Sequence, residues 1–353
     1  MNSIEVSFFG GLRYNESMKN FNRPVAKIIG TGSYVPERVL SNQDLEKMVE
    51  TSDEWIVSRT GMKERRIARG DEFTSDMGLA AAKKALEAAK IPAESLDLIL
   101  FATLTPDYIF PSTACLIQTQ LGATKAAAVD IQAACTGYLY VLGMAKAFIE
   151  SGIYKNILVI AAEKLSSIVN YTDRNTCVLF GDGASAAVIS SEGPSENRGL
   201  AIREISLGSD GELAKLLILP AGGSRQPATR ESVDGGLHFL QMEGKEVFKH
   251  AVRRMESASK EVIDRAGIKE SEISWLIPHQ ANMRIIEALA KRFEVPMEKV
   301  FITIHKYGNT SASSVGIALD EMLRQNNAKK GDNILLTAFG AGLTWGASLL
   351  THE

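Results

Sequence analysis

Three polar residues stand at or near the ends of strand-like segments of the sequence, and their types suit nucleophilic catalysis by a thiol. Cys135 precedes an amphipathic stretch, so its sulfur is expected at the positive end of a helix, where the pKa of a thiol falls towards the nucleophilic thiolate. His279 follows the apolar run WLIP, and Asn309 follows Gly308. Taken singly, each has a structural alternative: a buried cysteine, a core histidine and a Gly-Asn turn. Taken together, they predict one site.

The elements that must position these residues alternate between strand-like and helix-like periods, which predicts an α/β protein. The order of elements then recurs. In the first half, the pattern predicts a strand, a helix, a strand and a helix over residues 97–107, 111–122, 126–135 and 136–152. In the second half, it predicts the same series over residues 273–282, 283–294, 300–309 and 310–325. Each half closes with an apolar segment that contains glycine, at 176–192 and at 333–353.

This repeat predicts three regions, which are a disordered N-terminal extension over 1–23, an N-terminal half over 24–196 and a C-terminal half over 197–353. If a pseudo-twofold axis relates the halves, Cys135 and Asn309 occupy corresponding strand ends, and His279 joins them from a neighbouring strand. Open α/β sheets place their sites at such carboxyl ends. The segment 221–236, rich in Gly, Ser, Pro and charge, is predicted to be a long exposed loop that borders the site.

Composition narrows the class of protein. A chain of 353 residues with 45% hydrophobic and 23% charged residues can bury a large core, and a net charge of -3 argues against nucleic acid and anionic membranes as partners. No apolar run approaches the roughly 20 residues that span a bilayer. Three scattered cysteines predict neither disulfides nor a metal site, and they favour a cytoplasmic location. Cys115, in a predicted helix, and Cys177, in a predicted strand, are expected to be buried structural residues.

Several longer motifs resemble one known family. They are DEWIVSRTGMKERRI, DIQAACTGYLY, FGDGASAAV, PHQAN, HKYGNTSASS and FGAGLTWG. From about Val25 to its end, the chain resembles the β-ketoacyl-acyl carrier protein synthases III of the thiolase superfamily. The resemblance implies a thiolase-like α/β fold, in which two pseudo-symmetric βαβαβαββ halves form a layered α-β-α-β-α core. It also implies that Cys135, His279 and Asn309 are the catalytic residues.

The resemblance further implies a reaction in two steps. Cys135 takes an acyl group from acyl-CoA, while the backbone N–H groups of Cys135 and Ala341 stabilise the oxyanion. His279 Nε2 and the Asn309 amide then stabilise the enolate that forms when malonyl-acyl carrier protein loses carbon dioxide. Ala341 stands where the family usually has glycine, and a backbone donor tolerates alanine unless its φ must be positive. No cofactor is implied, since acyl-CoA is a substrate.

Trp55 and Arg59 lie four residues apart, after a capping box predicted from Thr51 and Glu54, so their side chains share one face of a helix. Without the resemblance, a surface Trp with an Arg lying across it is the simpler interpretation. The resemblance instead implies that Trp55, Arg59 and Arg174 clasp the adenine of CoA, because a guanidinium stacks on aromatic planes.

Other residues are placed by the resemblance as well. Asn282 corresponds to a residue that reaches the pantetheine arm. Phe339 corresponds to a residue that keeps the decarboxylation site apolar, and plain core packing is the alternative for it. Phe110 corresponds to a residue that a homodimer inserts towards its partner's acyl pocket. An acidic carrier protein needs a cationic dock, although a solvated charged face is the alternative for any such cluster. The expected docking residues are Lys249, Arg253, Arg284, Lys291 and Arg292.

Three other functions compete with condensation. A thiolase-like acyltransferase would move the acyl group from Cys135 to an alcohol, an amine or an alkylquinolone precursor, and the presence of both His279 and Asn309 argues against it. A non-catalytic acyl-CoA-binding module would not need a cysteine at a helix start. A reducing NAD enzyme would need the GxGxxG fingerprint, which GTGSYVP does not match.

Overall fold

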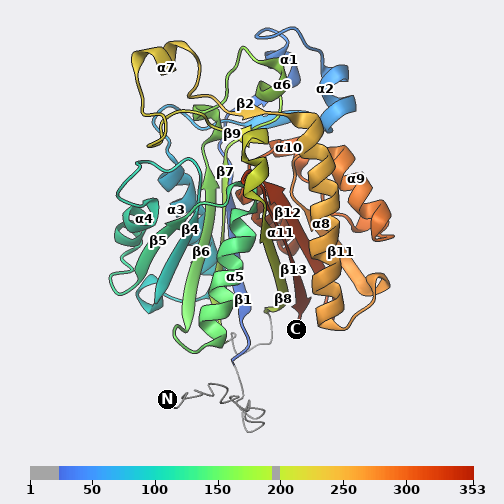
Figure 1. Cartoon of the computed structure of the whole chain (residues 1–353). Helices are drawn as coiled ribbons and strands as arrows, with labels where there is room; N and C mark the ends of the chain where they lie inside the picture. Colours follow the sequence, from blue (N-terminus) through green and yellow to red (C-terminus); the bar gives the residue numbers. More distant parts are fainter. Residues whose placement is uncertain (1–23, 193–198) are drawn as a thin grey trace, which may run out of the picture.

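The computed structural model describes residues 24–192 and 199–353. The predicted extension over 1–23 and the predicted boundary between residues 196 and 197 lie outside the described residues. Within them, nine strands form one mixed sheet in the order β11-β12-β13-β8-β1-β7-β6-β4-β5 (Figure 1). These strands are β1 (Lys27–Tyr34), β4 (Leu98–Ala102), β5 (Ala127–Ile131), β6 (Asn156–Glu163), β7 (Gly183–Ser190), β8 (Leu200–Ser209), β11 (Ile273–Pro278), β12 (Asn333–Gly340) and β13 (Thr344–His352).

The sheet order is the same on both sides of a narrow seam. On one side, β5, β4 and β6 are parallel, and β7 and β1 follow antiparallel to their neighbours. On the other side, Val300 bridges in parallel to β11, β11 is parallel to β12, and β13 and β8 follow antiparallel. The seam itself is a short pairing of β1 with β8 at Lys27 and Ile28. This internal likeness accounts for the repeat in the sequence.

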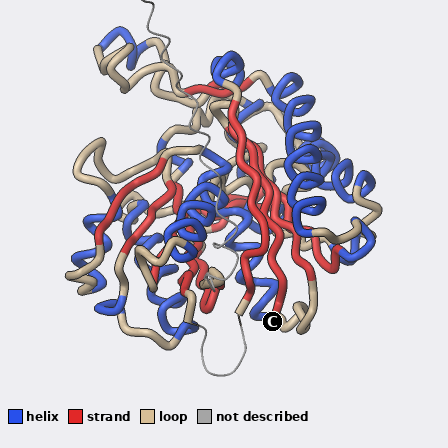
Figure 2. Tube along the Cα trace, turned by 60° about the horizontal axis from the view of Figure 1, so that its bottom comes forward, coloured by secondary structure: helices blue, strands red, loops and turns tan. Residues whose placement is uncertain are grey.

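The helices complete the layers. They are α1 (Asn42–Leu45), α2 (Asp53–Thr60), α3 (Thr74–Ala89), α4 (Thr113–Leu121), α5 (Gly137–Glu150), α6 (Arg174–Cys177), α7 (Arg230–Asp234), α8 (Gly244–Ala266), α9 (Met283–Arg292), α10 (Ile304–Tyr307) and α11 (Ser313–Arg324). Helices α5 and α11 contact strands of both groups and each other, so they lie between the two groups of strands. Figure 1 labels both helices, and Figure 2 shows helices between two groups of strands. Helices α3 and α4 cover one outer face, and α8 and α9 cover the other (Figure 1). The predicted thiolase-like α/β fold is confirmed.

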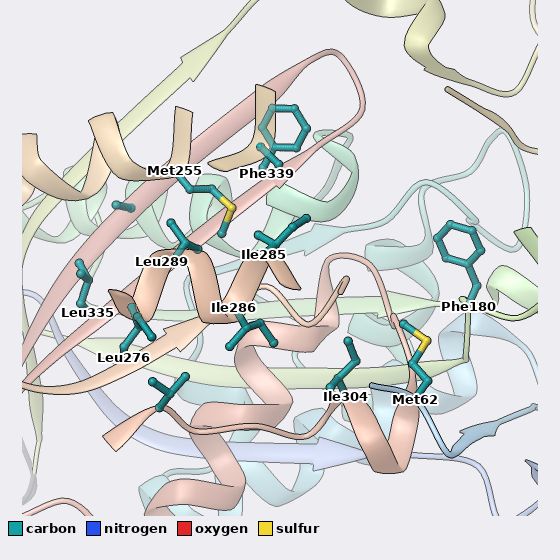
Figure 3. Packing of buried hydrophobic residues seen from close by; sticks show 14 of the residues in the cluster. Met62, Phe180, Met255, Leu276, Ile285, Ile286, Leu289, Ile304, Leu335 and Phe339 are labelled. Atoms are coloured by element: carbon teal, nitrogen blue, oxygen red, sulfur yellow. The ribbon is translucent and has the colours of Figure 1, made fainter. Parts of the chain in front are cut away.

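Burial on both faces explains the strand sequences at the centre. Strands β6 and β7, NILVIAAE and GASAAVIS, are buried along nearly their whole lengths, as expected for strands covered by helices on both sides. Helix α3 packs on β1 so closely that a Cβ at Gly30 would lie 2.5 Å from the carbonyl oxygen of Ala85. On the opposite outer face, Ile285 and Leu289 of α9 pack with Met255 of α8 (Figure 3). These contacts hold the segment around His279 against the sheet.

The structure corrects the predicted strand over 300–309. Only the two ends of this range pair, each as an isolated parallel bridge: Val300 with Leu276 of β11, and Asn309 with Phe180. The short helix α10 lies between them. The chain then turns at Gly308, which has a φ of 63°, and Asn309 donates its N–H to Leu179 O. The alternating pattern of this segment favours a strand, but a tertiary contact determines its conformation instead.

Four smaller predictions also need correction. Cys177 is buried as expected, but it lies in α6 rather than in a strand, and Cys115 of α4 is exposed rather than buried. The N-cap of α2 is Ser52 rather than Thr51, because the Ser52 hydroxyl accepts a hydrogen bond from the Trp55 N–H. The predicted loop over 221–236 contains the short helix α7, which is capped by Thr229.

Two short strand pairs lie outside the main sheet, namely β2 (Val39–Ser41) with β3 (Glu64–Arg66), and β9 (Leu217–Ile218) with β10 (Gln241–Met242). Across residues 24–192 and 199–353, no helix has the length and apolar character needed to cross a membrane.

Candidate active site

Cys135, His279 and Asn309 line one cavity of about 730 Å³. Cys135 belongs to the 3-10 turn η3 (Ala134–Thr136), between β5 and α5. His279 directly follows β11, and Asn309 lies in the turn between α10 and α11. The three side chains therefore converge on one cavity, as predicted. The roles assigned to them stay predictions.

The Cys135 thiol lies where the sequence predicted, but the pKa of this thiol is raised rather than lowered. Its turn runs directly into α5, so the sulfur sits at the start of a helix. The side chain is nevertheless buried, and burial raises the pKa of the Cys135 thiol to about 11, although a hydrogen bond from Ser311 and the residue's own backbone N–H oppose this effect. Desolvation of the thiolate is the largest of these effects. It opposes the lowered pKa that the position at a helix start predicts.

The His279 ring is held in one orientation. Its backbone N–H donates to Thr337 O at 2.8 Å, and its Nδ1 lies 2.6 Å from Ser314 Oγ. Ser314 Oγ also accepts the N–H of Gln280 at 3.4 Å, and its own hydroxyl proton can be donated to His279 Nδ1. Burial lowers the pKa of His279 to about 4, so the ring is neutral at neutral pH. With Ser314 as the donor to Nδ1, the ring proton lies on Nε2, the nitrogen predicted to donate.

The Asn309 amide is oriented by its own turn. Its Oδ1 accepts the N–H of Ser311 at 2.8 Å, so the Nδ2 group is the part of the amide free for the cavity that Asn309 lines. The backbone is fixed by Asn309 N–H to Leu179 O at 2.8 Å and by Gly181 N–H to Asn309 O at 3.0 Å. Both His279 and Asn309 thus present neutral N–H donors.

The segment after β12 forms one wall of the cavity. Phe339 and Gly340 line it, and Phe339 is buried, whereas Ala341 is not among the lining residues. Ala341 has no left-handed φ, while the next residue, Gly342, has a φ of 137°. Alanine at position 341 therefore meets no backbone strain. Its part in an oxyanion hole stays a prediction.

Aromatic and cationic side chains gather at the cavity mouth. The Arg59 and Arg174 guanidinium carbons lie 4.8 Å and 4.9 Å from the centre of the Trp55 ring. Asn282 caps α9 through its Oδ1 and donates from Nδ2 to Arg59 O at 3.1 Å. The structure brings together all four residues predicted to bind CoA, and three of them, Trp55, Arg59 and Asn282, line the cavity itself.

The predicted docking residues divide into two groups. Lys249 of α8 and Arg284 of α9 line the cavity mouth. The others lie on exposed faces of the same helices, outside the lining: Arg253, Lys291 and Arg292. Arg292 is engaged in an ion pair with Glu256 at 2.9 Å. Exposed Lys245 and Phe248 also line the cavity and were missed. Lys245 lies four residues, about one helical turn, before Lys249, and that spacing was a usable signal.

Phe110 does not line the cavity of its own chain. Its side chain is 85% exposed and stands beside exposed Tyr108 and Ile109. No residue of 221–236 lines the cavity either, so the predicted loop does not border it in this structure. In the described part of the chain, no three His, Cys, Asp or Glu side chains are grouped to hold a metal ion.

Sequence reasoning also missed three buried residues around the site. Ser314 orients His279, and Ser311 lies within 3.5 Å of Cys135 Sγ and 3.3 Å of Glu163 Oε1. Both serines belong to the motif HKYGNTSASS, but nothing in their spacing shows what they contact. Glu163 ends the apolar strand β6, the same kind of strand exit that pointed to His279.

Comparison with known proteins decides the family. Sequence models of 3-oxoacyl-(acyl carrier protein) synthase III match residues 129–211, and models of its C-terminal part match residues 263–352. The chain is 61% identical over 325 residues to the β-ketoacyl-(acyl carrier protein) synthase III of Chlamydia pneumoniae, covering 92% of this chain and 96% of that protein. The chain belongs to the β-ketoacyl-(acyl carrier protein) synthase III family.

Other members agree. The synthase III of Caldanaerobacter subterraneus is 57% identical over 325 residues, covering 92% of this chain and 97% of that protein. The crystal structure of the Aquifex aeolicus synthase III matches with a TM-score of 0.84 and 52% identity, covering 93% of this chain and all of that one. As a member of the synthase III family, the chain is a condensing enzyme of the acyltransferase class.

Proposed function

We propose that this chain condenses an acyl-CoA primer with malonyl-acyl carrier protein, with loss of carbon dioxide, and so begins type II fatty acid biosynthesis. The product is a 3-ketoacyl-acyl carrier protein. One observation carries the proposal: a cysteine at a helix start, two neutral N–H donors and an aromatic, cationic mouth all belong to a single cavity. The proposal joins that geometry to the family to which the chain belongs.

In the first half-reaction, the thiolate of Cys135 attacks the thioester carbon of acyl-CoA. The bond from that carbon to the CoA sulfur breaks, the CoA thiolate takes up a proton, and the acyl group stays on Sγ. The backbone N–H groups of Cys135 and Ala341 are the proposed donors to the oxyanion. At the mouth, the adenine would stack on Trp55 in place of a guanidinium that now covers it.

In the second half-reaction, the malonyl group loses its carboxylate as carbon dioxide. The electron pair of the broken C–C bond forms an enolate, whose oxygen receives hydrogen bonds from His279 Nε2 and Asn309 Nδ2. The enolate carbon attacks the acyl carbon on Cys135, and the thiolate leaves. The low pKa of His279 matters here, because a cationic ring would protonate and quench the carbanion that has to attack.

The partners follow from the same proposal. Acyl carrier protein would dock at the mouth, where Lys245, Lys249 and Arg284 offer positive charge to an acidic partner. The exposed apolar segment from Tyr108 to Phe110 supports the predicted homodimer. The cytoplasmic location stays a prediction.

Mass spectrometry of the intact protein and its peptides tests the first half-reaction. Acyl-CoA should add one acyl group to Cys135, Cys135→Ala should remain unmodified, and exposed Cys115→Ala, the matched control, should be acylated like the wild type. Release of carbon dioxide from malonyl-acyl carrier protein, measured with a panel of acyl-CoA primers, tests the second. Acylation elsewhere, or an acylated enzyme that passes its acyl group to another acceptor without releasing carbon dioxide, would refute the proposal.

A further inference from the structure

Glu163 is a buried carboxylate for which the condensation described above has no use. It ends β6 and is fully shielded from solvent. Its Oε2 accepts hydrogen bonds from Thr105 Oγ1 at 2.6 Å, Leu104 N at 3.1 Å, and Thr103 Oγ1 and Thr105 N, both at 3.2 Å. Uncharged donors thus fix one oxygen of the carboxylate, while burial without a cation keeps the charged form costly. Such an arrangement holds a carboxylate ready to accept a proton.

The other oxygen of Glu163, Oε1, shares the Leu104 N–H at 3.2 Å and is linked to the nucleophile through one side chain. Ser311 Oγ lies 3.3 Å from Glu163 Oε1 and 3.5 Å from Cys135 Sγ. One hydroxyl proton cannot serve both acceptors. The carboxylate is the stronger acceptor, since hydrogen bonds to charged groups are about twice as strong as neutral ones. The lone pairs of Ser311 Oγ then remain to receive the S–H of Cys135.

We propose that Glu163 accepts the proton of Cys135 through Ser311 and so generates the thiolate that attacks acyl-CoA. The S–H bond of Cys135 breaks, its proton binds Ser311 Oγ, and the original Ser311 proton passes to Glu163 Oε1. A thiol and a carboxylate become a thiolate and a carboxylic acid, and Ser311 is unchanged. When CoA leaves as a thiolate, the reverse path returns the proton to it. This step rests on the acyl-Cys135 intermediate of the proposed function.

The backbone around Ser311 supports this arrangement. Ser311 is 1% exposed and has a φ of 51°, a left-handed conformation that a residue other than glycine keeps only when its surroundings enforce it. Its N–H donates to Asn309 Oδ1 at 2.8 Å. The same residue therefore holds the Asn309 amide with its backbone and joins Cys135 to Glu163 with its hydroxyl.

The surroundings of Glu163 contain few other charges. Strand β4 and its loop present Thr103, Leu104 and Thr105, and the turn before α11 presents Ser311, all uncharged. Cys135 is the titratable group that Glu163 meets through Ser311. Lys164, the next residue in the chain, turns away and donates to the carbonyl oxygens of Arg69 and Glu72.

Burial sets the acidities of the two ends of this path. It raises the pKa of Glu163 to about 7, against the pull of its hydrogen-bond donors, and that of Cys135 to about 11. The thiol is the weaker acid of the two, so the proton should leave as the sulfur attacks rather than beforehand. Ionised Glu163 is the active form, and the acylation rate should therefore rise as the pH rises through about 7.

Rapid-quench mass spectrometry of Cys135 acylation by acetyl-CoA, from about pH 6 to about pH 10, tests the path. Glu163→Gln keeps the shape but cannot take a proton, and it should acylate roughly 10²-fold more slowly at neutral pH. Its rate should lose the inflection near 7 and rise about tenfold per pH unit, so that the difference from wild type narrows at high pH. Ser311→Ala, which keeps the N–H that holds Asn309, should behave in the same way.

Two controls separate this role from support of the fold. Thr103→Val removes one donor to Glu163 Oε2 but leaves Ser311 and Glu163 in place, so the inflection should remain and move to higher pH, because this hydrogen bond lowers the pKa of Glu163. Decarboxylation of malonyl-acyl carrier protein without a primer should stay within about threefold in Glu163→Gln, because it does not need the thiolate.

The outcomes are distinguishable. Wild-type rates in Glu163→Gln at neutral pH would overturn the proposal, as would a loss that is equal at every pH and shared by decarboxylation. If Glu163→Gln does not fold, the pH profile of Ser311→Ala decides. If the wild type itself is never acylated on Cys135, the proposed function fails before the proton path is reached.

Discussion

Replacing Gly340 with alanine should displace the nucleophile of this enzyme. A Cβ at position 340 would lie 2.7 Å from the backbone nitrogen of Cys135 and 2.8 Å from its Cβ, whereas ordinary contacts begin at 3.4 Å. The Cys135 nitrogen would therefore have to move by about 0.7 Å, the difference between 3.4 and 2.7 Å. Overpacking of this kind costs about 1–3 kcal/mol of unfolding free energy. A misplacement approaching 1 Å in a site slows the chemistry by up to about 10²-fold.

Two measurements check this expectation. Chemical denaturation of Gly340→Ala should show the loss of stability, and quenched-flow mass spectrometry should show acylation of Cys135 slowed by roughly 10- to 100-fold. Gly70→Ala is the matched control, because nothing lies within 4 Å of a Cβ there and its φ is not left-handed; it should change stability by less than about 0.5 kcal/mol. Wild-type acylation together with wild-type stability in Gly340→Ala would refute the argument that Gly340 positions Cys135.

Three further predictions address the other functional groups. Asn309→Ala should leave acylation of Cys135 within a few-fold of wild type but slow condensation by about 10²- to 10³-fold, and equal loss of both steps would contradict the assigned roles. Trp55→Ala should raise the KM for acyl-CoA by about tenfold and leave kcat unchanged, whereas kinetics with an acyl-pantetheine, which lacks adenine, should not respond. Burial lowers the pKa of His279 from 6.5 to about 4, so between these values the unfolded chain binds a proton that the folded chain does not. The free energy of unfolding should therefore fall as the pH drops through this window, by on the order of 3 kcal/mol. Denaturant titrations should show a shallower fall for His279→Gln.

Sequence patterns predicted the site residues well where the signal was local. Cys135, His279 and Asn309 each lie at or near the end of a predicted strand, and the predicted elements recur in the same order, so their convergence could be expected before any coordinates. The sequence did not show which face of a long helix lines the cavity. Lys249 and Arg253 have equally plausible helical spacing, but only Lys249 lines the cavity, because the packing of α8 on the sheet decides which side of the helix is turned towards the mouth.

The segment 300–309 shows a different limit. Its alternating residues favour a strand, yet it forms only two isolated bridges, at Val300 and at Asn309, because the chain has to turn back to bring Asn309 against Leu179. That contact joins residues 130 positions apart in sequence. No local period carries such information.

What the sequence determined by itself was the α/β class, the repeated halves and the identity of the thiol, imidazole and amide that meet in one cavity. What only the tertiary structure decided was the protonation chemistry of those groups. Cys135 becomes a weak acid because the walls that bury it come from distant segments, and its link to Glu163 runs through Ser311, which is 148 residues from Glu163 along the chain. Desolvation and hydrogen bonding depend on which atoms surround a group, and those atoms are known only once the chain has folded.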